Sequence, residues 1–192
     1  MEFEVLKDFA LHSKVPEEIV KKNKDKIPAQ FIEIWENYGF GTFQRGYFKV
    51  INPDDYIEFV RKSYFEKNCI PLLVTAFGDI VVWEKNEYLS LLTYRYQNFD
   101  CLEYGCEFFF NDLSDNKYVE RHFKNRNFYK ALEKLDIPSY DECFGYVPLL
   151  SLGGGLRIYK CPFCEIHFRR QQLQKQTHTI HPAQYSFGRN IV

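Results

Sequence analysis

The sequence lacks a long apolar run and contains a single methionine among its 192 residues. A membrane-spanning helix needs about 18 or more consecutive apolar residues, so no membrane partner is expected. The first residues, Met1 to Asp8, include acids and no apolar stretch, which argues against a secretory signal and for a cytoplasmic protein. Six cysteines in a chain of this length, without such a signal, indicate reduced thiols and not a disulfide framework.

The net charge of the chain is also small, at −1, but the charged residues are unevenly distributed along the sequence. Residues 156–192 hold six Lys/Arg and one acid, Glu165, so the first 155 residues carry a net charge of −6. An acidic body argues against nonspecific DNA binding and suits a basic protein partner, because complementary fields speed association. An acidic surface kept for solubility is the alternative interpretation.

Aromatic residues are abundant, with 19 Phe, 14 Tyr and 2 Trp making up 18% of the chain. We expect most of these rings to fill a rigid core. Some Tyr and Trp side chains are expected on the surface, where they commonly anchor protein partners.

The apolar pattern alternates between helical and strand periods. Helices are predicted over residues 15–26, 28–38, 52–64 and 127–135, and a short helical turn over Asp141–Gly145. A hairpin is predicted over residues 42–51 and strands over 70–76, 80–83 and 88–96. The breaks between these strands are too short for anything but antiparallel neighbours. The predicted class is therefore α+β, with an antiparallel meander sheet packed with helices. Residues 98–110 have no clear pattern, although Phe108, Phe109 and Phe110 are expected to be buried.

Residues that carry chemistry form no catalytic pattern. Paired acids stand at residues 54–55, 112 with 115, and 141–142, where each has a simpler role at a helix start. His12 and His122 stand alone, without a matching nucleophile. Gly153–Gly155 lacks the Lys-Ser/Thr of a phosphate-binding loop and is expected to serve a turn. A non-enzymatic protein is predicted, with a small-substrate enzyme left as a distant alternative that would need a deep polar pocket.

Five segments, in this order, resemble one family architecture. They are Ile27–Gly39, Gly46–Tyr56, Ala76–Trp83, Phe128–Leu135 and Tyr140–Gly154. The first three resemble a GAD-like domain, and the last two resemble the C-terminal domain of type VI secretion DNase-immunity proteins. The layout is also similar to the broader SUKH immunity superfamily. The resemblance implies a GAD-like domain over residues 1–105, an immunity C-terminal domain over 106–155 packed against it, and a divergent basic tail over 156–192.

The resemblance also implies a function. It predicts an immunity protein that binds and neutralises a cognate toxin, a basic nuclease, without catalysis. Together with the acidic body, it points to surface acids as partner-binding residues. Those acids are Glu17, Glu18, Asp54, Asp55, Glu58, Asp141 and Glu142.

The tail contains a candidate zinc site. Its four ligands would be Cys161, Cys164, His178 and His181. Two thiolates and two imidazoles suit tetrahedral zinc. The spacing departs from the zinc-finger pattern, because 13 residues separate Cys164 from His178 and two separate the histidines. A basic tail with chance cysteines is the alternative, and the protein would then need no cofactor. A finger-like tail would instead make the chain a nucleic-acid-binding protein, which is the second functional hypothesis.

Overall fold

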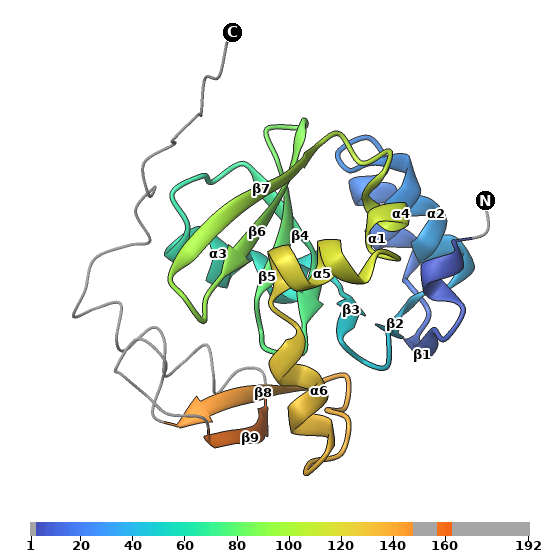
Figure 1. The fold of residues 1–192 in the computed structure, drawn as a ribbon. Coiled ribbons are helices and arrows are strands. Elements are labelled where there is room, and N and C mark those ends of the chain that lie inside the picture. Colours follow the sequence, from blue (N-terminus) through green and yellow to red (C-terminus); the bar gives the residue numbers. More distant parts are fainter. Residues whose placement is uncertain (1–2, 148–156, 163–192) are drawn as a thin grey trace, which may run out of the picture.

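The computed structural model describes residues 3–147 and 157–162 of the chain. Its centre is a seven-stranded antiparallel sheet in which every strand pairs with the next strand along the chain (Figure 1). The strands are β1 (Ala10–Ser13), β2 (Phe40–Phe43), β3 (Phe48–Val50), β4 (Cys69–Thr75), β5 (Ile80–Glu84), β6 (Tyr88–Thr93) and β7 (Asn98–Tyr104). A separate antiparallel pair is formed by β8 (Glu142–Val147) and β9 (Arg157–Pro162). The predicted meander and α+β class are confirmed.

Helices surround the sheet (Figure 1). They are η1 (Glu4–Leu6), α1 (Glu17–Asn23), α2 (Ala29–Asn37), η2 (Pro53–Asp55), α3 (Ile57–Ser63), α4 (Phe109–Asp112), α5 (Asn116–Phe123) and α6 (Arg126–Leu132). None of these has the length and apolarity that a bilayer crossing requires.

Two helix boundaries show how local sequence sets these elements. Helix α2 ends before Gly39, whose φ of +86° favours glycine, and an added Cβ there would lie 2.6 Å from the Ser13 carbonyl oxygen. At η2, the Asn52 side chain accepts a hydrogen bond from the Asp54 amide, with Pro53 in the first turn. The helix predicted over 52–64 is thus a 3₁₀ turn followed by α3.

The central strands are buried on both faces, which explains their continuous apolar runs. On one face, residues such as Val81 and Leu91 join the main core. On the other face, Val82 packs in a second cluster with Val60 and Tyr64 of α3. The sheet therefore separates two apolar layers.

Aromatic rings connect the first part of the chain with the part beyond β7. The ring of Phe31 in α2 lies 5.1 Å from that of Phe110 in α4. The ring of Tyr47, between β2 and β3, lies 5.0 Å from that of Phe128 in α6. All four residues belong to one core cluster. The chain therefore folds around a core that both parts share.

Three local predictions were wrong or incomplete. Residues 142–147 form strand β8 and not a helical turn, because they pair in register with β9. Phe108 is 62% exposed, whereas Phe109 and Phe110 are buried as expected. Residues 98–104, which have no clear sequence pattern, form edge strand β7, and exposure along most of this strand removes the regular apolar signal.

A buried ion pair lies where the sheet meets the later helices. Arg95 Nε donates to Asp79 Oδ2 over 2.6 Å, and both side chains are completely buried. Arg95 Nη2 also donates to the Phe123 carbonyl over 2.7 Å, and the guanidinium lies 4.4 Å from the Phe77 ring centroid. This pair joins the β4–β5 and β6–β7 turns to the end of α5.

Candidate functional site

Three of the predicted partner-binding acids come close together in the fold. Asp54 and Asp55 lie in η2, and Asp141 lies just before β8; all three are exposed. Burial raises the pKa of Asp55, and the neighbouring carboxylates of Asp54 and Asp141 act in the same direction. We call Asp54, Asp55 and Asp141 the acidic face. Asp55 interacts electrostatically with both other carboxylates of the acidic face, although Asp141 is distant in sequence from Asp54 and Asp55.

Lys49 holds the segment that carries Asp141. This β3 side chain is only 1% exposed, and its Nζ donates to the carbonyls of Ser139 (2.7 Å), Tyr140 (2.9 Å) and Glu142. Burial lowers the pKa of Lys49 to about 8. The position of Lys49 between Phe48 and Val50, in an otherwise apolar strand, was the sequence signal for its structural role. No predicted site included Lys49.

Replacing Lys49 with methionine is expected to lower the free energy of unfolding by about 1–3 kcal/mol, because the backbone carbonyls of Ser139, Tyr140 and Glu142 lose their donor. Urea titration of the two proteins measures this difference. Lys62→Met removes a lysine whose side chain is 69% exposed and should change the free energy by less than about 0.5 kcal/mol. Equal losses in the two variants would contradict the role of Lys49.

An aromatic pair lies beside the acidic face. The rings of His12 in β1 and Tyr140 stack with their centroids 4.0 Å apart and their planes 7° apart. The Tyr140 hydroxyl donates to the Val50 carbonyl over 3.0 Å. Tyr140 immediately precedes Asp141, so the stacked pair provides a partly apolar rim next to the carboxylates.

The remaining predicted acids have other surroundings. Glu17 pairs with Lys21 (3.0 Å), and Glu58 lies 3.9 Å from Arg61 and 3.6 Å from Lys62. Glu18 is exposed on α1. Helix α1 is tied to the acidic face, because Lys22 Nζ lies 2.6 Å from Asp54 Oδ1.

Glu142 has a structural contact of its own. Its Oε2 accepts a hydrogen bond from the Ser139 amide over 3.0 Å, and hydrogen bonding to Ser139 lowers the pKa of Glu142. Its carboxylate therefore closes the turn that leads into β8.

Only one of the four predicted zinc ligands falls among the described residues. Cys161 is buried in β9 opposite Cys143 of β8, and its thiol donates to the Cys143 carbonyl over 3.6 Å. Cys164, His178 and His181 lie outside the described residues. Within residues 3–147 and 157–162, no group of three or more His, Cys, Asp or Glu is arranged to hold a metal ion. The zinc site remains a prediction.

The fold defines the structural class of the protein, which is an α+β meander. A crystal structure with a similar fold is known. The chain is similar to the crystal structure of Atu4351 from Agrobacterium tumefaciens, with a TM-score of 0.70 over 89% of each chain and 18% sequence identity. No curated protein matches the sequence.

Two protein families match consecutive parts of the chain. Residues 3–94 match the GAD-like domain, and residues 104–160 match the C-terminal domain of the T6SS immunity protein Tdi1. The chain belongs to the type VI secretion immunity proteins that combine these two domains. The second match continues to residue 160, beyond Gly155, and so includes part of β9.

Proposed function

We propose that this immunity protein neutralises a basic nuclease toxin by binding it through the acidic face, with no reaction of its own. The observation that carries the proposal is the convergence of Asp54, Asp55 and Asp141 on one exposed area of an immunity protein. A nuclease needs positive charge to hold the phosphate backbone. Such a surface is complementary to clustered carboxylates, and complementary fields accelerate association.

The structure around the face suits a pre-organised binding surface. Lys49 holds the backbone on either side of Asp141, and Tyr140 is fixed by its ring stacking and by its hydroxyl bond. Groups that are already ordered lose less conformational entropy on binding. The stacked rings of His12 and Tyr140 supply the partly apolar contact that charged interfaces need beside their ion pairs.

The proposal predicts that Asp54→Asn/Asp55→Asn/Asp141→Asn slows association with the toxin by about tenfold or more at low salt, because electrostatic steering is lost. Surface plasmon resonance with a toxin from the neighbouring gene measures both rate constants. Raising the salt concentration should narrow the gap between the variant and the wild-type protein, since salt screens exposed charges.

A matched variant controls for net charge. Glu87→Gln/Glu107→Gln/Glu133→Gln removes three exposed acids from other parts of the surface and should leave the association rate within about twofold of wild type. Equal slowing by both triple variants would overturn the assignment of the acidic face.

A plasmid-cutting assay tests the nuclease activity of the toxin and its neutralisation separately from the binding measurements. Plasmid DNA incubated with the toxin should be cut, and an equimolar amount of immunity protein should stop the cutting. If the DNA is cut whenever the immunity protein is less concentrated than the toxin, and is protected otherwise, the result supports stoichiometric binding. Protection at one molecule per many toxin molecules would show turnover and overturn the non-catalytic mechanism.

A further inference from the structure

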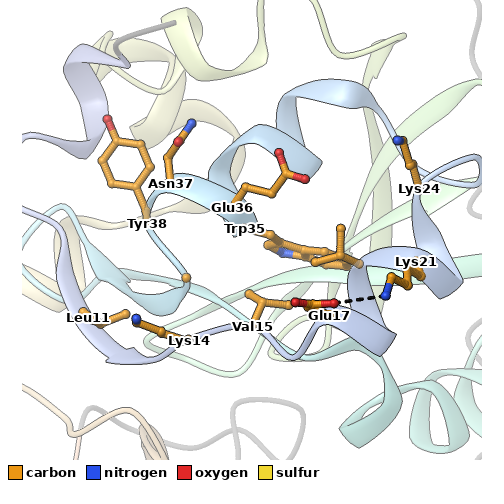
Figure 2. A pocket seen from close by; sticks show the side chains of 12 residues that line it. Leu11, Lys14, Val15, Glu17, Lys21, Lys24, Trp35, Glu36, Asn37 and Tyr38 are labelled. Carbon is orange, nitrogen blue, oxygen red and sulfur yellow. Dashed lines mark hydrogen bonds and ion pairs between the residues drawn. The ribbon is translucent and has the colours of Figure 1, made fainter.

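A groove lies between α1, α2 and the β1 edge of the sheet, and none of the three carboxylates of the acidic face lines it (Figure 2). Its volume is about 590 Å³, within the usual range for small-ligand sites. Apolar and aromatic side chains form much of its lining, namely Leu11, Val15, Val20, Trp35 and Tyr38. Figure 2 shows the Trp35 indole near the centre of the lining side chains.

Trp35 lines this groove and has a buried hydrogen-bond donor without a partner in the described part of the chain. The residue is 2% exposed, and its Nε1 has no partner among the described residues. An indole nitrogen can only donate, so whatever completes its hydrogen bonding must be an acceptor. The second tryptophan differs in this respect, because Trp83 Nε1 donates to Asn86 Oδ1 over 3.2 Å.

The charges on the groove rim favour an anionic acceptor. Lys21 is neutralised by Glu17 at 3.0 Å. Lys14 and Lys24 line the groove and form no ion pair within the described part of the chain. Glu36 is the remaining acid in the lining, and its negative charge offsets one of the two positive charges of Lys14 and Lys24. After the Glu17–Lys21 pair is set aside, the rim carries one excess positive charge.

We propose that the groove binds a small organic carboxylate on an aromatic or aliphatic stem. The carboxylate accepts a hydrogen bond from Trp35 Nε1 and is attracted by Lys14 and Lys24, while the stem packs against the apolar lining. This ligand site uses other residues than the acidic face, and it does not depend on the proposal of toxin binding there.

Nuclear magnetic resonance of the ¹⁵N-labelled full chain tests the proposal, with phenylacetate as the probe. The two tryptophans give two indole N–H resonances, so Trp83 serves as an internal control. Phenylacetate should shift the Trp35 resonance in a saturable manner and leave the Trp83 resonance in place. Phenylacetamide, which keeps the stem and removes the charge, should bind more weakly, and benzylamine should bind least.

Two variants separate charge recognition from simple filling of a cavity. Lys14→Ala/Lys24→Ala should weaken phenylacetate binding by about fivefold, and Glu36→Gln should strengthen it by up to about fivefold. Both changes are at exposed positions, so the fold should be kept. A shift that is absent, that is the same for the three probes, or that is unchanged in both variants overturns the proposal.

The source of the carboxylate is settled by a second titration. The dipeptide Ala-Phe, acetylated at its N-terminus, offers the same carboxylate at the end of a peptide chain. Saturable shifts with phenylacetate alone support a free organic acid as the ligand. Tighter binding of the dipeptide than of phenylacetate would overturn a small-molecule ligand and point to a peptide terminus.

Discussion

Asp79→Ala is expected to lower the free energy of unfolding by about 3–5 kcal/mol. The change leaves the Arg95 guanidinium completely buried without its carboxylate, and it also removes the acceptor for the Arg95 amide at 3.2 Å. Burying an uncompensated charge costs much more than the intact ion pair contributes. Urea denaturation followed by the fluorescence of Trp35 and Trp83 measures the loss.

A double variant tests whether the unpaired charge is the cause. Asp79→Ala/Arg95→Met removes both charges and should be more stable than the sum of the two single changes predicts, by about 1–3 kcal/mol. An exposed pair provides the contrast, because Glu17→Gln breaks a contact between side chains 76% and 88% exposed and should cost less than about 1 kcal/mol. Strict additivity in the double variant would contradict this explanation.

Phe128→Ala is expected to destabilise the whole chain by about 3–5 kcal/mol in a single unfolding transition. Phe128 is fully buried, and its ring lies 5.0 Å from Tyr47 in the GAD-like domain and 6.0 Å from Phe144 in β8. Both tryptophans belong to the GAD-like domain, so their fluorescence reports on that domain alone. Circular dichroism reports on all helices and strands, and the two signals should change together.

The neighbouring position offers a matched control. Tyr129 is 41% exposed, and Tyr129→Ala should cost about 1 kcal/mol or less, since little buried area is lost. If Phe128→Ala left the tryptophan transition unchanged while circular dichroism showed an earlier one, the two domains would unfold separately. That outcome would contradict a shared core.

Local patterns predicted α1, α2, α3 and α6 and the meander of β4, β5 and β6 for a physical reason. The positions of Phe31, Ile34 and Trp35 repeat at the helical period, and the short turns after β4 and β5 leave only antiparallel pairing. The failures lie where partners are distant in sequence. Residues 142–147 become a strand because β9 supplies their hydrogen-bond partners, and β7 lies at a sheet edge where apolar periodicity is weak.

The candidate site was predicted only in part. Acidic residues at 54, 55 and 141 could be named from composition and family resemblance, but nothing in the sequence placed them together. Lys49 and the His12–Tyr140 stack, which hold and border the face, depend on contacts between β1, β3 and the segment before β8. The groove around Trp35 was missed, because a helical tryptophan in an apolar stripe has the same pattern whether its indole nitrogen is satisfied or not.

The sequence by itself determined the α+β class, the antiparallel pairing of β4, β5 and β6, and the immunity family, because these follow from local periodicity, short connections and ordered motifs. Tertiary structure alone decided which charges are buried, which carboxylates converge and which donor is left without a partner. Each of these depends on groups brought together from distant parts of the chain. Desolvation and Coulomb interaction act through space, and the sequence shows only distance along the chain.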